Sequence, residues 1–136
     1  VLAGDGPERG EVERRAAGEG SIHLLGLRSD AAALYQAFDL LVLPSRFEQV
    51  PLVLLEAMAS DLPIAASAIE SIAEFLPVPP ARLFPPGDAD ALAALLGEEA
   101  ARGQRRQRYD MTPFDPEGQA AKIDAFYEKV IRARAS

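Results

Sequence analysis

The chain has 136 residues, of which 49% are hydrophobic and 26% charged, which is enough for one domain with a core. Its formal net charge of −7 argues against broad nucleic-acid binding, because such binding needs a positive field. The absence of cysteine removes disulfides and thiolate metal sites and fits a reducing compartment, and no apolar run has the length of a membrane span. We therefore expect a soluble globular domain.

Strand-like and helical segments alternate along the chain, a pattern typical of a parallel sheet covered by helices on both faces. We expect strands at Val1–Gly4, Ser21–Leu25, Leu40–Pro44, Pro63–Ala66 and Arg82–Phe84. We expect helices at Pro7–Gly18, Asp30–Phe38, Pro51–Ser60, Ile69–Leu76, Asp88–Ala100 and Pro116–Arg134. Asp88 is placed to cap the fifth helix, and the last helix carries an apolar stripe of Ile123, Phe126, Tyr127 and Val130.

The most informative stretch runs from Pro44 to Ala59 and contains two glutamates eight positions apart, Glu48 and Glu56. Between Val50 and Ala59 every residue except Glu56 is apolar or proline. Because burial of an unpaired carboxylate is strongly unfavourable, a buried Glu56 needs a partner, a bound ligand or an opening to solvent.

The same stretch predicts an anion site at the start of a helix. Pro51 suits the first helical position, where its missing N–H is no loss. The free N–H groups of Leu52 and Val53 and the positive end of the helix dipole then favour an anion. This arrangement suits a sugar nucleotide, with its phosphate on the N–H groups and its hydroxyls on the carboxylates of Glu48 and Glu56.

Two purely structural interpretations compete with this site. Glu56 is also interpretable as a core glutamate paired with a nearby arginine such as Arg46. Ser45 and Glu48 stand at the spacing of a capping box, in which Glu48 only closes a turn.

The residues of this stretch also carry a family resemblance. Residues 44–59, PSRFEQVPLVLLEAMA, resemble the donor-site signature of retaining GT-B glycosyltransferases, the large fourth family. The segments LAGDGPE (2–8), HLLGLRSDAAALYQAFDLLVLPS (23–45) and LFPPGDADALAALL (83–96) are similar to further segments of that family. The resemblance implies an α/β fold, with the Rossmann-like three-layer α/β/α parallel sheet of the C-terminal half of a GT-B enzyme. It also implies that residues 1–136 are a single nucleotide-sugar-binding domain, truncated at its N-terminus and without the N-terminal domain.

The resemblance assigns roles to the residues of the motif. It implies that Glu56 accepts hydrogen bonds from the ribose hydroxyls of the nucleotide. It implies that Glu48 is the catalytic residue, which orients the hydroxyls of the donor sugar and stabilises positive charge developing at C1. The backbone amides of four residues would hold sugar hydroxyls and diphosphate, namely Gln49, Val50, Leu52 and Val53. The family prefers glycine at the positions of Gln49 and Asp61 and near Glu70–Ser71, so this chain departs from the pattern there.

Other segments are weaker candidates. By resemblance, Leu27 and Arg28 lie in the turn that contacts the nucleobase, with Arg28 stacked on the base or, alternatively, solvated. Gly4 and Gly6 either cradle phosphate or only permit a turn, and Ser45 is a further candidate at the donor site. No spacing typical of metal ligands is present, so we expect no metal and no cofactor, with a nucleoside-diphosphate sugar as donor substrate.

Taken together, these features indicate the donor domain of a retaining, metal-independent hexosyltransferase. We expect this domain to be inactive without the rest of the enzyme. The acceptor, a sugar, lipid or small molecule, would bind mainly on the missing domain. We expect a cytoplasmic protein that binds no nucleic acid. The four arginines between Arg102 and Arg108 would either allow peripheral contact with anionic lipid at the inner membrane face or form a solvated helix face. Two other functions remain open, a GT-B sugar-nucleotide epimerase and a non-catalytic nucleotide-binding or interaction module.

Overall fold

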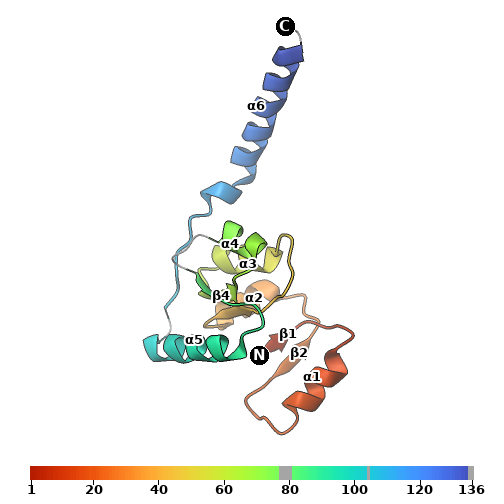
Figure 1. Ribbon diagram of the computed structural model, residues 1–136, viewed down its shortest axis with the longest axis vertical. Coiled ribbons are helices and arrows are strands. Elements are labelled where there is room, and N and C mark those ends of the chain that lie inside the picture. The colour runs from red at the N-terminus through yellow and green to blue at the C-terminus, as the bar shows by residue number, and fades with distance from the viewer. Residues whose placement is uncertain (77–80, 104, 135–136) are drawn as a thin grey trace. The chain divides into compact units, whose positions relative to one another are not determined.

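The computed structural model describes residues 1–76, 81–103 and 105–134 (Figure 1). The contacts between Cα atoms divide the chain into two compact units, Val1–Leu34 and Tyr35–Ser136. The single domain expected over residues 1–136 stays a prediction.

The first unit is a strand–helix–strand motif. It consists of β1 (Leu2–Ala3), α1 (Arg9–Ala16) and β2 (Leu24–Gly26). The two strands pair in parallel, with Leu2 opposite Leu24, so α1 makes the crossover that a parallel pair requires. No residue of α1 is buried, which makes this unit poor in core packing.

The second unit is built around a parallel sheet with the strand order β3-β4-β5. Its strands are β3 (Leu41–Leu43), β4 (Ile64–Ser67) and β5 (Arg82–Phe84), and Leu41 lies opposite Ile64. The helices along the chain are α2 (Ala31–Ala37), which crosses the boundary between the units, α3 (Leu52–Ala59), α4 (Glu70–Phe75) and α5 (Ala89–Arg102). All four residues of β4 are buried, as expected for a central strand covered on both faces.

The core of the second unit is made by β4 and the inner faces of its helices. Leu54 and Met58 of α3 are fully buried, as are Leu62 and Ile64 before and in β4 and Ile72 of α4. A neighbouring cluster joins Ala65, Phe84 of β5 and Leu95 of α5. The apolar run after Val50 therefore supplies core packing for the sheet through one face of α3.

The helix ends confirm one expectation and correct another. The Asp88 carboxylate accepts a hydrogen bond from the backbone N–H of Ala91 at 2.9 Å, so the predicted cap is present. Asp61 follows α3 with a φ of 53°, a left-handed conformation that aspartate tolerates better than most residues. Pro51 occupies the N-cap of α3 rather than its first helical position, so the helix begins one residue later than expected.

The residues after α5 form an ordered strap, here residues 105–115, rather than a loose linker. The backbone N–H of Gln107 donates to the Asp61 carbonyl at 2.7 Å, and the Tyr109 hydroxyl donates to the Leu62 carbonyl at 3.1 Å. Arg106 donates to the carbonyl of Tyr35 at 2.8 Å. These bonds fasten the strap to the C-terminal ends of α2 and α3. The strap ends in a 3₁₀ turn at Thr112–Phe114.

Helix α6 spans Pro116–Arg134 and buries none of its described residues. Its apolar stripe is open to solvent, with Ile123 54%, Phe126 63% and Tyr127 61% exposed. The helix therefore draws little stability from packing within the part of the chain that is described. In that part, no helix combines the length and hydrophobicity needed to cross a bilayer.

This contrast predicts a large effect for one truncation to alanine and almost none for another. Leu54→Ala should lower the free energy of unfolding by about 2–5 kcal/mol, because it leaves a cavity around a side chain with no solvent exposure. Phe126→Ala should leave it nearly unchanged. Urea denaturation of both variants measures the difference. A loss for Phe126→Ala as large as that for Leu54→Ala, and independent of protein concentration, would contradict the exposed position of the stripe.

Candidate donor-binding site

The candidate site of the second unit lies at the carboxyl ends of its parallel strands. Residues 44–51 form a loop that leaves β3, and α4 begins shortly after β4 ends. Because parallel strands share one direction, these two segments meet at the same edge of the sheet, where open α/β sheets bind ligands. Ser71 of α4 contacts Glu48 of the loop directly, which confirms the meeting.

Glu48 is half-buried and is held at two points. The Ser45 hydroxyl donates to its carboxylate oxygen Oε1 at 2.7 Å, and the Ser71 hydroxyl donates to its backbone carbonyl at 2.8 Å. No helix begins at Ser45, so the pair is not the capping box that its spacing allows. The carboxylate is oriented by a neutral hydroxyl and keeps capacity for further donors.

Glu56 lies on α3 but is exposed, so the prediction that this carboxylate is buried is wrong. The reason is helical geometry, because Leu54, Ala57 and Met58 turn inward and Glu56 points to the opposite side of the helix. The described partner of Glu56 is the hydroxyl of Tyr35, which donates to Oε2 at 2.7 Å, and not Arg46.

Tyr35 is the residue that positions Glu56. The residue is only 7% exposed, and burial, with a smaller contribution from the bond to Glu56, raises its pKa to about 12. The tyrosine therefore stays protonated at neutral pH and remains a donor to the Glu56 carboxylate. The main chain of Tyr35 is in turn held by Arg106 of the strap.

Four backbone N–H groups around the start of α3 have no acceptor among the described residues. They belong to Gln49, Val50, Leu52 and Val53, the residues predicted to bind the donor through their amides. The side chains of Val50 and Leu52 are 60% and 65% exposed, so solvent reaches this region. Free amides at a helix N-terminus have the chemistry of an anion site.

The nucleobase candidates lie in the first unit. Leu27 is 83% exposed. The guanidinium of Arg28 donates through Nε to the Asp30 carboxylate at 2.7 Å, and this bond lowers the pKa of Asp30. Arg28 is thus oriented by a neighbour rather than fully solvated, and its stacking on a base stays a prediction.

The glycine turn of the first unit surrounds a hollow of about 420 Å³. The Gly4 N–H donates to the Gly26 carbonyl at 2.7 Å, and the Gly6 N–H donates to the Asp5 carboxylate at 2.8 Å. Both amides are therefore already engaged in this conformation, which favours a turn-forming role over a phosphate cradle.

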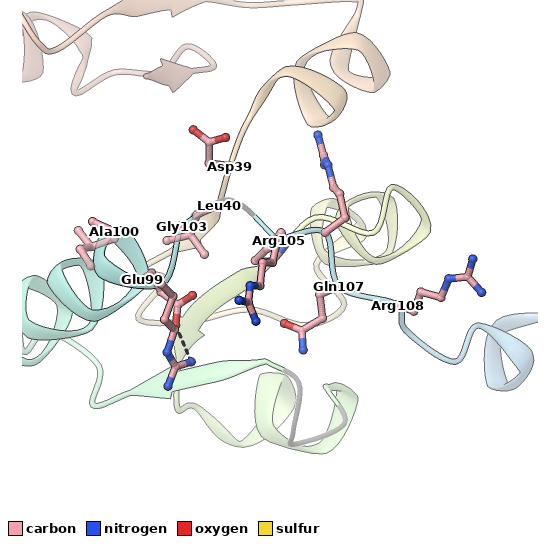
Figure 2. Close-up of a pocket in the computed structure, with 12 residues that line it drawn as sticks. Asp39, Leu40, Glu99, Ala100, Gly103, Arg105, Gln107 and Arg108 are labelled. Carbon is pink, nitrogen blue, oxygen red and sulfur yellow. Dashed lines mark hydrogen bonds and ion pairs between the residues drawn. The ribbon is translucent and has the colours of Figure 1, made fainter.

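A larger hollow, of about 910 Å³, lies elsewhere in the second unit (Figure 2). Its lining includes Leu40 and Pro63, which precede β3 and β4, so it lies at the amino edge of the sheet, away from Glu48. Figure 2 shows the side chains of Arg105 and Gln107 pointing to the same side, whereas Arg108 points away from them. The arginines of the strap therefore do not converge on one point, and contact with anionic lipid stays a prediction.

Two further observations concern polar groups. In the described residues, no three His, Cys, Asp or Glu side chains form a group that could hold a metal ion. Ser67, at the carboxyl end of β4, is fully buried, and its hydroxyl has no hydrogen-bond partner in the described part of the chain.

Tyr35 and Ser71 were not among the candidates from sequence. Each contacts a predicted glutamate across 21 or 23 positions of the chain. A hydroxyl on a helix has no local pattern that reveals such a distant partner. The one available signal was Ser71 itself, which stands near positions where the family prefers glycine.

Comparison with known proteins shows the family. Residues 1–98 match the model of the family described as "Glycosyl transferases group 1", and the chain belongs to this family. It is 36% identical over 75% of its length to the MMP alpha-(1->4)-mannosyltransferase of Mycolicibacterium hassiacum, and 31% identical over 75% to the alpha-D-kanosaminyltransferase of Streptomyces kanamyceticus. The chain spans 27% and 29% of these two proteins.

Solved structures show the same fold. HepE of Anabaena in complex with UDP aligns with 77% of the chain at a TM-score of 0.67 and 26% identity, and 32% of HepE is covered. The lipopolysaccharide outer core galactosyltransferase WaaB aligns with 93% of the chain at a TM-score of 0.70 and 22% identity, and 40% of WaaB is covered. The chain thus has the Rossmann-like α/β parallel-sheet fold of the C-terminal portion of a GT-B glycosyltransferase.

Because the fold stabilises Tyr35 in its protonated form, the free energy of unfolding should depend on pH in the alkaline range. The folded pKa of about 12 exceeds the ordinary value of 10.0, so this contribution to stability is complete below pH 10 and is lost as pH rises towards 12. Tyr109, whose pKa burial also raises to about 12, acts in the same direction. Urea midpoints between pH 8 and pH 12 should therefore fall, and Tyr35→Phe and Tyr109→Phe should each reduce the fall. A fall of unchanged size in Tyr35→Phe would contradict the raised pKa of Tyr35.

Proposed function

We propose that this chain is the donor domain of a retaining glycosyltransferase. It would bind a nucleoside-diphosphate sugar for transfer of the sugar to an acceptor hydroxyl. The observation that carries the proposal is the loop after β3 with the start of α3, where Glu48 and four backbone N–H groups without an acceptor among the described residues stand at the carboxyl edge of a parallel sheet. Membership of the family supports it, and so does the binding of UDP by HepE.

The roles are those that the resemblance to the family implies, and the chemistry of these groups supports them. Glu56, with one oxygen bonded to Tyr35, keeps lone pairs for the two ribose hydroxyls. The amides of Gln49, Val50, Leu52 and Val53 would donate to diphosphate and sugar oxygens. Glu48 would face the donor sugar, where its negative charge stabilises the positive character that develops at C1. Leu27 and Arg28 would contact the base.

Because the chain spans about a third of the structures it matches, the activity of a whole transferase is part of the proposal. The acceptor would bind mainly on another domain, in a cytoplasmic protein that requires no metal. An epimerase and a non-catalytic nucleotide-binding module are the alternatives. No feature of the described residues favours either alternative. The Glu56 and Glu48 variants distinguish both alternatives from a transferase.

Glu56→Ala should weaken nucleotide binding, because it removes the acceptor of the ribose hydroxyls. A hydrogen bond to a charged group contributes about 1.5–3 kcal/mol, so the dissociation constant for UDP should rise about tenfold to a hundredfold. Calorimetry with UDP on the 136-residue chain measures it. Glu117→Ala is the matched control, because it removes the same charge from an exposed glutamate of α6. Equal affinity of wild type and Glu56→Ala would show that Glu56 is structural.

Glu48→Gln should lower the catalytic rate and leave donor binding nearly unchanged. Its charge becomes useful as C1 becomes positive, so in the intact transferase kcat should fall by about a hundredfold while the donor KM changes little. Ser45→Ala, which removes the hydroxyl that orients the carboxylate, should cause a smaller loss in kcat.

Three results would count against this role of Glu48. An unchanged kcat together with a lower melting temperature would show that Glu48 only supports the loop. A product in which the donor sugar is epimerised and not transferred would favour the epimerase. Nucleotide binding by an intact protein that turns over no donor would favour the non-catalytic module.

A further inference from the structure

Ser71 makes a contact that no glycine at its position could make. It lies in the first turn of α4, and its hydroxyl donates to the backbone carbonyl of Glu48 at 2.8 Å. Both groups are half-buried, so the bond competes less with water than one on an open surface. Ser71 thus connects the segment after β4 to the loop after β3.

The acceptor of this bond belongs to the peptide group that joins Glu48 to Gln49. A trans peptide is planar, and its C=O and N–H bonds point in opposite directions. With the Glu48 oxygen directed at Ser71, the Gln49 N–H must point to the side of the loop away from Ser71. The hydroxyl of Ser71 therefore determines which way the Gln49 amide faces.

The Gln49 N–H has no acceptor among the described residues. The carboxylate of the preceding Glu48 is held separately by Ser45, so the two serines hold different parts of one residue. Without Ser71, this exposed loop would have one constraint fewer on the rotation of the peptide, and the amide would sample other directions.

We propose that Ser71 is a positioning residue that holds the Gln49 amide towards the sugar part of the donor. The inference rests on the proposed function, and it makes the Ser71–Glu48 bond a determinant of how the sugar is recognised. Gln49, which stands where the family prefers glycine, and Ser71, which stands near other such positions, meet at this one peptide group. The nucleotide part, assigned to Glu56, does not depend on the bond.

The test uses the 136-residue chain, its Ser71→Ala and Ser71→Thr variants, and Ser60→Ala as control. Ser60 is a half-buried serine at the end of α3 whose hydroxyl makes no hydrogen bond within the described residues. Two quantities are measured: the ¹H–¹⁵N signal of the Gln49 amide without ligand, and the affinities for UDP and UDP-glucose by calorimetry.

Ser71→Ala should shift and broaden the Gln49 signal and weaken UDP-glucose binding about threefold to tenfold, the effect of one net hydrogen bond, while UDP binds as before. Ser71→Thr should restore both quantities, and Ser60→Ala should change neither. An unmoved Gln49 signal in Ser71→Ala overturns the positioning role, and so does an equal loss for UDP and UDP-glucose. Failure of the wild-type chain to bind either ligand even weakly overturns the proposed function instead, and the Gln49 signal still decides whether Ser71 orients the amide.

Discussion

The central strand β4 is the constraint on which the second unit depends. All four of its residues are buried, and it pairs in parallel with β3 on one side and β5 on the other. Parallel pairing with both faces covered requires a helix between successive strands, so α3 and α4 must return over the sheet. The loop with Glu48 and the start of α4 with Ser71 are thereby brought to one edge, although 23 positions separate the two residues.

Much of the fold could be predicted from the sequence because its signals are local. The apolar run bounded by turn residues at β4 indicates a buried strand, and Asp88 before an apolar-periodic segment indicates a helix start; both are found. The burial of Glu56 was predicted wrongly for the opposite reason. An apolar run around a residue does not say which face of the helix is covered, because that depends on tertiary packing. The hydroxyls of Tyr35 and Ser71 were missed because their partners are distant in the chain.

Both predicted glutamates are held by neutral hydroxyls rather than by cations. Tyr35 donates to Glu56 and Ser45 donates to Glu48, and no ion pair within the described residues includes either carboxylate. An arginine partner would lower the negative potential of the site and occupy the lone pairs. A hydroxyl orients the carboxylate while leaving its charge uncompensated. This arrangement suits groups that must accept from sugar hydroxyls or face a carbon that becomes positive.

The same uncompensated charge makes a diphosphate harder to bind in this unit. A helix N-terminus offers the equivalent of about half a positive charge, which does not offset two carboxylates. The free amides of the loop can direct phosphate oxygens, but they cannot neutralise them. On the proposed function, the hydroxyls of ribose and sugar would therefore contribute more to binding in this unit than the charge of the diphosphate. On this argument, nucleoside diphosphates bind the 136-residue chain weakly, and the energy of binding comes mainly from hydroxyl and amide contacts rather than from charge.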